Sequence, residues 1–302
     1  MHYYTAYGLT IVSELECPEL TAVEPGEESD ITIALAELSP RIDNPRHSTQ
    51  HVQVSEDLFQ FEQPGVARYR VIGGHIILIK TLGSSPPEEV RLHLLGTVFG
   101  ALLHQQGRLP LHASAVEQEG GGIAFCGHSG AGKSTLATAL NRRGLALLCD
   151  DVGVVVPNAD GAPLFYPGFP RVKLWQDALH HFELDPKTLT PDWRRAEKYQ
   201  LNLQDRFQLR PLPLRQIWFL EYAVEGENAA VHPLTPTQGV PLLVANTYRP
   251  SLARWLGDFQ AHFHRCARIA ESVALGRYVR PRSLTQLDAS LDVLVREGTM
   301  IE

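Results

Sequence analysis

The feature that most constrains the fold is a glycine-rich loop between an apolar segment and a helix-forming segment. Residues 124–140 read AFCGHSGAGKSTLATAL, in which Gly127 to Ser134 fits the pattern GxxxxGK[ST]. Glycine reaches backbone conformations that are closed to other residues, so successive N–H groups of such a loop can point at one anion. An apolar strand, a glycine loop and a helix in this order predict a P-loop within an α/β domain.

Each residue type in the loop has a chemical reason to be there. A helix that starts near Gly132 adds the positive end of its dipole. Lys133 can reach the β- and γ-phosphates of a nucleotide, and the Ser134 hydroxyl is a ligand for Mg²⁺. The expected cofactors are therefore ATP, or another nucleoside triphosphate, and Mg²⁺. The predicted nucleotide-binding residues are Gly127, His128, Ser129, Gly130, Ala131, Gly132, Lys133, Ser134 and Thr135.

Two adjacent aspartates follow the next apolar segment. Residues 145–149 read LALLC, a buried strand by its composition, and they end at Asp150 and Asp151. A strand–helix–strand crossover leaves its two strands parallel, so the second strand ends at the sheet edge that carries the glycine loop. Two carboxylates there allow a division of labour, because one can hold Mg²⁺ while the other accepts the proton of an attacking hydroxyl. The alternative is that the two aspartates only form a solvated end of the strand and have no catalytic role.

His112 is the third candidate group. It lies in LPLHASAVEQ (109–118), which we expect to form a hairpin with residues 121–127 through a turn at Gly120–Gly122. In that hairpin, His112 would lie beside the aspartates and orient one of them. Spacing alone leaves open the alternative of a hydrogen-bonded core histidine.

Residues 112–156, which contain HASAV, GHSGAGKS and the double aspartate, resemble the catalytic core of the HPr serine kinase/phosphorylase family. That family places a histidine, a P-loop and two aspartates at similar spacings. The resemblance implies an unusual P-loop domain related to phosphoenolpyruvate carboxykinase. It covers about 45 residues and fades toward the C-terminus, and the first 100 residues are unlike the family's own N-terminal domain.

The resemblance also implies roles for single residues. It makes Lys133 the phosphate-binding lysine and Ser134 a metal ligand. It makes Asp150 the general base, with His112 as its partner, and Asp151 a metal-binding group of the Walker B type.

The chain departs from the family at two places. Thr135 stands where the family has an acidic residue, and YPGFPRVKLW (166–175) replaces a glycine-rich segment with a metal-binding glutamate. These departures favour a divergent subgroup. Some of its members resemble kinases that phosphorylate a serine of ribosomally made precursor peptides, such as those of lasso peptides.

Three cations in and beyond the replaced segment are candidate phosphate or substrate contacts: Arg171, Lys173 and Lys198. Strand alternation places the first two on one face, and a solvated face is the alternative reading for all three. Residues 185–198 are polar and are expected to form a mobile loop that serves as a lid or docking edge.

The remaining sequence predicts two domains: a β-rich accessory domain over residues 1–84 and a P-loop catalytic domain over residues 85–302. Residues 30–38, 51–63 and 67–80 are rich in β-branched and aromatic residues. A helix is expected from residue 85 to Gly107, a strand at 214–222, one long helix at 251–275 and a last helix near the C-terminus.

Composition restricts the class of partner. The net charge of −7 argues against a duplex-binding protein, which would need a basic face. No segment approaches the roughly 20 apolar residues that span a bilayer, and there is no signal-peptide pattern, so we expect a cytoplasmic protein without membrane partners. The four cysteines are far apart and fit buried free thiols. The sequence leaves open the possibility that the chain forms a homo-oligomer.

The pattern as a whole predicts an ATP- and Mg²⁺-dependent kinase that acts on a serine hydroxyl of a peptide or small protein. Two alternatives stay open: a small-molecule kinase with the same chemistry, and a nucleotide-gated binding module that transfers no phosphate.

Overall fold

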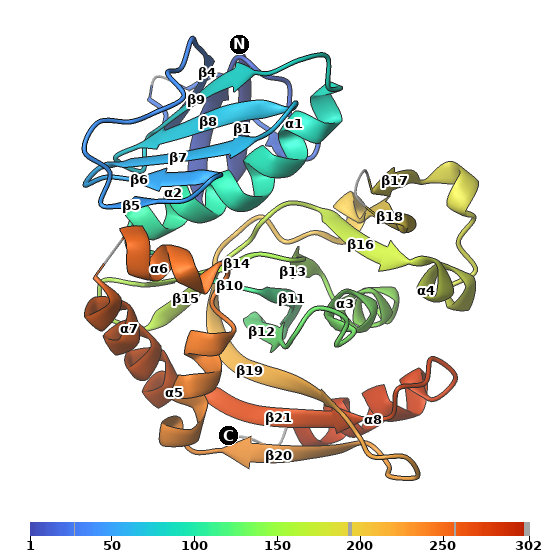
Figure 1. The fold of residues 1–302 in the computed structure, drawn as a ribbon. Coiled ribbons are helices and arrows are strands. Elements are labelled where there is room, and N and C mark those ends of the chain that lie inside the picture. Colours follow the sequence, from blue (N-terminus) through green and yellow to red (C-terminus); the bar gives the residue numbers. More distant parts are fainter. Residues whose placement is uncertain (27, 193–194, 257, 299–302) are drawn as a thin grey trace. The chain divides into compact units, whose positions relative to one another are not determined.

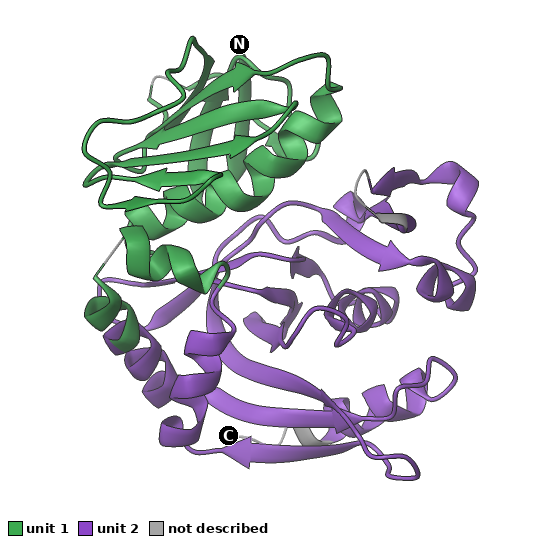
Figure 2. Ribbon diagram, in the orientation of Figure 1, with its two compact units in different colours: residues 1–110, 248–263 green, residues 111–247, 264–302 purple. Residues whose placement is uncertain are grey.

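The computed structural model describes residues 1–26, 28–192, 195–256 and 258–298, and it divides into two compact units (Figure 2). Unit 1 comprises Met1–Pro110 and Tyr248–Phe263, and unit 2 comprises Leu111–Thr247 and His264–Glu302. The division falls elsewhere than the predicted boundary between residues 84 and 85. The helical segment after residue 86 belongs to unit 1, and a later segment returns to that unit.

Unit 1 is built on a nine-stranded sheet of order β3-β1-β2-β4-β9-β8-β7-β6-β5 (Figure 1). Only β2–β4 and β4–β9 are parallel among its named pairs. The β-rich character predicted for the first third of the chain is therefore confirmed. The strands are β1 (His2–Ala6), β2 (Leu9–Ser13), β3 (Thr21–Ala22), β4 (Ile31–Leu35), β5 (His47–Ser48), β6 (Val52–Val54), β7 (Leu58–Gln63), β8 (Ala67–Ile72) and β9 (Ile76–Thr81).

One helical segment packs on this sheet. It consists of α1 (Pro87–His93), a π-helical turn (Leu94–Val98) and α2 (Phe99–Gln105), and the Tyr69 hydroxyl on β8 donates to the Val90 carbonyl of α1 at 2.8 Å. The chain then leaves the helix at Gly107, which has a φ of 68°. This matches the predicted helix, although the π-helical turn interrupts it. The returning segment adds α6 (Pro250–Leu256) to unit 1.

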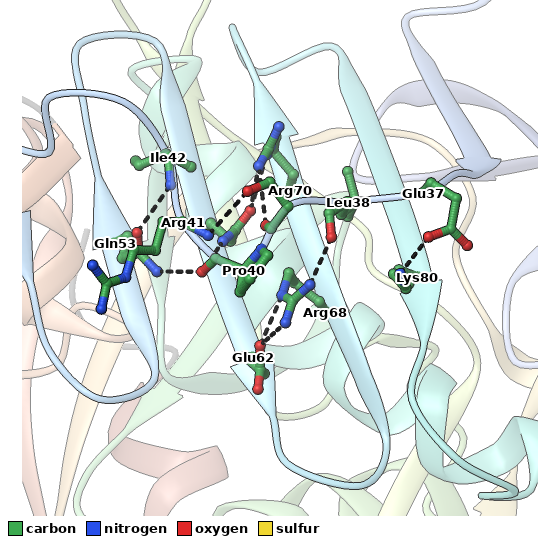
Figure 3. Close-up of polar contacts among 12 residues, drawn as sticks. Glu37, Leu38, Pro40, Arg41, Ile42, Gln53, Glu62, Arg68, Arg70 and Lys80 are labelled. Carbon is green, nitrogen blue, oxygen red and sulfur yellow. Dashed lines mark hydrogen bonds and ion pairs between the residues drawn. The ribbon is translucent and has the colours of Figure 1, made fainter.

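The other face of this sheet carries polar side chains that hold residues 37–42 (Figure 3). Arg68 is 7% exposed and donates to the Leu38 carbonyl at 2.6 Å while it pairs with Glu62. Gln53 donates to the Pro40 carbonyl at 2.8 Å. These bonds satisfy the backbone carbonyls of Leu38 and Pro40, two residues that lie between β4 and β5 and outside both strands.

Unit 2 is built on a mixed sheet of order β10-β14-β15-β19-β12-β11-β13, with β21 also paired to β19 and β20 to β21. The strands β12, β19 and β21 run parallel to one another. The strands are β10 (Leu109–Leu111), β11 (Ala113–Gln118), β12 (Gly121–Cys126), β13 (Leu147–Cys149), β14 (Gly153–Pro157), β15 (Pro163–Tyr166), β19 (Leu212–Tyr222), β20 (Ala230–Leu234) and β21 (Ala274–Arg280).

The predicted hairpin and crossover are both present in this sheet. Strands β11 and β12 pair antiparallel, with Ala113 opposite Cys126, and the turn between them is Glu119–Gly120, one residue earlier than expected. Strand β13 also pairs antiparallel with β11, so it runs parallel to β12 with β11 between them. The crossover therefore delivers the end of β13 to the same edge as the end of β12.

A three-stranded sheet, β16-β18-β17, completes unit 2. It contains β16 (Arg171–Trp175), β17 (Thr190–Asp192) and β18 (Arg195–Asn202), together with a 3₁₀ helix (Pro186–Thr188). Alternate β16 residues Val172 and Leu174 join the apolar core, which also holds Trp218 and Tyr278 of the large sheet. The helices of this unit are α3 (Lys133–Arg142), α4 (Gln176–His181), α5 (Pro236–Ala245), α7 (Phe259–Ser272), which begins in unit 1, and α8 (Leu287–Gly298).

Two expectations about local structure are wrong. The single helix expected at 251–275 is instead two helices, α6 and α7, and the chain has become strand β21 by Ala274. The polar segment 185–198 was expected to be a mobile loop, but its described residues hold the 3₁₀ helix, β17 and the start of β18; residues 193–194 lie outside the described part. Cross-strand pairing with β16 outweighed its polar composition.

Gly276 tests the packing of β21 against β19. A Cβ atom at this position would lie 2.2 Å from Cζ3 of the buried Trp218, so Gly276→Ala should lower the free energy of unfolding by about 1–3 kcal/mol in urea denaturation. Arg277→Ala is the matched control on the same strand, because Arg277 is exposed and its ion pair with Glu221 is exposed as well, and it should cost less than about 1 kcal/mol. Equal losses in the two variants would contradict this account of the packing.

Candidate functional site

The glycine-rich loop joins β12 to α3 and takes backbone conformations that favour glycine. The φ angles are 153° at Gly127, 91° at Gly130 and 83° at Gly132. At Gly127 a Cβ would approach the Leu220 carbonyl oxygen of β19 to 3.2 Å, so the residue is held there by close packing as well as by conformation. Helix α3 starts directly after Gly132, so its free N–H groups face the loop.

Lys133 folds back over the loop and is only 6% exposed. Its ammonium donates to the carbonyls of Gly127 at 2.7 Å and His128 at 3.1 Å, and it lies 3.1 Å from Nε2 of His112. Burial lowers the pKa of Lys133, while the negative charges of Asp150 and Asp151 oppose that shift. Within the described residues, this buried ammonium contacts neutral acceptors and forms no ion pair.

Asp150 is the buried member of the acidic pair, at 7% exposure. Its Oδ1 accepts from the Ser134 hydroxyl at 2.8 Å and from the Ser114 hydroxyl at 2.5 Å. Its Oδ2 accepts from the Lys173 backbone N–H at 3.0 Å. Three donors from three different segments therefore fix this carboxylate next to the hydroxyl that begins α3.

Asp151 lies at the open side of the site, with its side chain 50% exposed. Nδ1 of His112 lies 3.0 Å from the Asp151 carbonyl oxygen and 3.3 Å from its Oδ1. Because an ammonium only donates, the Lys133 contact assigns the lone pair to Nε2 of His112 and the proton to Nδ1. His112 thus links the loop lysine to the exposed carboxylate.

This geometry corrects the predicted partner of His112. The resemblance paired His112 with Asp150, but the structure places it against Asp151, and Asp150 bonds to Ser134 instead. The physical reason is the backbone of Asp151, which has a φ of 73° and breaks the alternation of a strand. Both carboxylates consequently lie at the glycine-rich loop.

The environment of Asp151 favours its ionised form. Partial withdrawal from water raises the pKa of this carboxyl, but its interaction with His112 and the positive charges of Lys173 and Lys198 outweigh that effect and hold the pKa well below its usual range. The group is therefore an ionised hydrogen-bond acceptor at neutral pH.

The three candidate cations lie on the small sheet and already have partners. Arg171 and Lys173 share one face, as predicted, and Arg171 donates to Gln200 at 2.9 Å. The Lys173 ammonium pairs with the buried Asp192 at 2.7 Å, and Lys198 lies over the Trp175 ring at 5.6 Å. The charges of Lys173 and Lys198 act on Asp151, but a direct role of the three cations in binding phosphate stays a prediction.

Three residues at the loop were not predicted from the sequence to belong to the site. Ser114 holds Asp150, and Tyr222 and Arg280 bond to the loop carbonyls of Gly130 and Ala131. The alternation of side-chain direction along residues 113–118 could have indicated Ser114 as a residue of the site. The other two depend on the pairing of β21 with β19, two segments far apart in the chain.

The oxygen atoms at this site fit a magnesium ion. Mg²⁺ in nucleotide sites takes one or two protein oxygens and completes its shell with phosphates and water. The Ser134 hydroxyl and the Asp150 carboxylate supply such a pair, 2.8 Å apart and held by further donors. No cluster of three or more acidic, cysteine or histidine ligands occurs in the described part of the chain.

Comparisons with known proteins include a distant likeness to a solved structure. No protein-family profile matches the chain, and no curated protein matches it. Among solved structures, the chain is similar to the Hpr(Ser) kinase/phosphatase from Coxiella burnetii, with 13% identity, a TM-score of 0.34, and coverage of 63% of this chain and 90% of that chain. A likeness of this degree does not establish a shared function, so any function has to be inferred from the chain's own residues. Across the described residues, no helix is both long and apolar enough to cross a bilayer.

The pKa of Asp151 provides a direct test of its contact with His112. In His112→Ala, we expect the pKa of this carboxyl to rise toward the unperturbed value of about 3.9, because the bond that favours the ionised form is lost. A depressed folded-state pKa contributes stability that is present above pH ~4 and is lost as the pH falls through the folded value, so the two proteins should converge in stability in strong acid.

The measurement is a ¹³C NMR titration of the aspartate carboxyls in wild type and His112→Ala. Ser114→Ala is the control, since it removes a bond to Asp150 and leaves the His112–Asp151 contact in place. An Asp151 titration that is identical in all three proteins would contradict the geometry.

Proposed function

We propose that the chain is a phosphotransferase that moves the γ-phosphate of ATP to a serine-type hydroxyl of a peptide or small protein. The observation that carries the proposal is the buried ammonium of Lys133, which lies in a glycine-rich loop at a helix start and has no carboxylate partner among the described residues. A buried charge is costly unless an opposite charge compensates it, and a nucleotide's phosphates are the anion that this loop fits.

The acidic pair supports transfer of the phosphate as well as its binding. Asp150 is fixed against Ser134, which suits a group that positions Mg²⁺. Asp151 is exposed, ionised and held by His112, which suits a group that accepts the proton of an incoming hydroxyl. We therefore assign the metal role to Asp150 and the base role to Asp151, the reverse of the roles that the family resemblance implied.

In the proposed reaction, the acceptor oxygen forms a bond to the γ-phosphorus and the bond from that phosphorus to the β–γ bridging oxygen breaks. The hydroxyl proton passes to the Asp151 carboxylate, and ADP leaves. In a loose transition state the proton moves late, so a positioned carboxylate of low pKa is adequate. Lys133 and the loop N–H groups stabilise the charge on the phosphate oxygens.

When bound, Mg²⁺ would neutralise the negative charge that develops on the phosphate oxygens during transfer. Ser134 and Asp150 are the residues that would hold it. Asp150 in turn keeps the Ser134 hydroxyl in place through the bonds from Ser114 and the Lys173 backbone.

A serine of a peptide or small protein is the acceptor class favoured by the resemblance of residues 112–156 to the HPr serine kinase/phosphorylase family. The exposed side of Asp151 leaves room for a macromolecular acceptor. A small-molecule kinase and a nucleotide-gated binding module remain the rivals.

The roles of the two aspartates are separated by matched substitutions. Asp151→Asn should reduce transfer by about 10²- to 10⁴-fold while Mg·ATP still binds, because only the proton acceptor is lost. Asp150→Asn should instead weaken the dependence of ATP binding on Mg²⁺. Transfer is measured with γ-³²P-labelled ATP against an array of serine peptides, each with its alanine counterpart, and binding is measured by calorimetry.

Each of the other outcomes of these transfer and binding measurements supports a different conclusion. Wild-type transfer by Asp151→Asn would overturn the base assignment. Label in free metabolites but in no peptide would favour the small-molecule kinase, and Mg·ATP binding without any transfer would favour the binding module.

A further inference from the structure

Tyr222 and Arg280 end the parallel strands β19 and β21, where they are register partners at the glycine-rich loop. The Tyr222 hydroxyl donates to the Gly130 carbonyl at 2.8 Å, and Nη2 of Arg280 donates to the Ala131 carbonyl at 3.1 Å. The Arg280 guanidinium also lies over the Tyr222 ring at 5.4 Å. Two consecutive loop carbonyls are thus held by two side chains that contact each other.

Holding a carbonyl also orients the next amide. In a planar trans peptide, the C=O of one residue and the N–H of the next point in opposite directions. The bond from Arg280 to the Ala131 carbonyl therefore turns the Gly132 N–H away from Arg280. On the same loop, Lys133 holds the carbonyls of Gly127 and His128, so four loop carbonyls are engaged before any ligand binds.

The loop sequence is adapted to this arginine. A Cβ atom on Gly132 would lie 2.0 Å from Nη2 of Arg280, closer than any side chain permits. Gly132, the second glycine of the pattern GxxxxGK[ST], is favoured by its φ of 83°, and its lack of a Cβ leaves space for the Arg280 guanidinium.

Arg280 is also a buried cation, and no described carboxylate compensates its charge. It is 4% exposed, its Nε is buried without a hydrogen-bond partner, and it forms no ion pair within the described residues. Such a group is costly when it serves stability alone. An anion in the adjacent loop would supply the missing negative charge.

We propose that Tyr222 and Arg280 form a clamp on the P-loop that orients its amides and so sets the affinity for the donor's phosphates. Both are positioning residues that act through the loop backbone. This inference rests on the proposed nucleotide binding and extends it to two residues outside the P-loop pattern. The clamp acts on binding, so its loss should raise the KM for ATP while kcat at saturating ATP changes little.

The test compares four variants by calorimetric titration with Mg·ADP, well below the melting temperature of each. Arg280→Met should weaken Mg·ADP binding by about tenfold or more, because it removes a charge-assisted bond and a compensating charge. Tyr222→Phe keeps the ring and loses only the hydroxyl, so it should weaken binding by roughly 2- to 10-fold. Arg282→Met and Arg277→Met should bind like wild type.

The two arginine controls separate a clamp from a general electrostatic effect. Arg282 is exposed and also lies 5.4 Å from the Tyr222 ring, and Arg277 is exposed on β21. If Arg282→Met weakens binding as much as Arg280→Met, or if Arg280→Met binds Mg·ADP like Arg277→Met, the clamp is overturned. Should Arg280→Met fail to fold, Tyr222→Phe and Arg280→Lys take its place. Mg·ADP binding by both that equals binding by Arg277→Met would then overturn the clamp. A wild-type chain that binds no Mg·ADP would refute the proposed nucleotide binding itself, a result distinct from equal binding by all variants.

Discussion

The hydrogen bond between Ser134 and Asp150 is the contact on which the site depends. It joins the first turn of α3 to the end of β13, two segments that the crossover brings to one edge of the sheet. Ser114 and the Lys173 backbone hold the same carboxylate, so β11 and β16 are fixed to this point as well. A carboxylate with three protein donors has little freedom, and this rigidity suits a group that positions a metal ion rather than one that changes partners during a reaction.

The second carboxylate has the opposite character. Asp151 is half exposed, and its φ of 73° turns it out of the strand that Asp150 ends. A non-glycine residue in this region stores strain, which the fold tolerates here because the turn presents the carboxylate to His112. Backbone conformation and burial thus give two adjacent aspartates different environments, which suit the different roles that we propose for them.

Much of this arrangement could be predicted from the sequence. The glycine pattern, the hairpin of β11 and β12 and the parallel position of β13 all follow from local patterns and short connections, which depend on few long-range contacts. The roles of Asp150 and Asp151 could not be ranked, because a single left-handed φ decides which of them faces His112. Tyr222 and Arg280 were missed because their place at the loop depends on pairing between strands more than 50 residues apart, which no local pattern records.

The division of labour between the two aspartates is tested most directly by locating a metal ion. Crystals grown with Mn²⁺ and a non-hydrolysable ATP analogue would show the ion through its anomalous scattering. The account predicts a peak coordinated by the Ser134 hydroxyl and reached by Asp150, directly or through water, with Asp151 facing the γ-phosphate without touching the ion. A peak coordinated by Asp151, or an analogue bound away from the loop of Gly127 to Ser134, would contradict it.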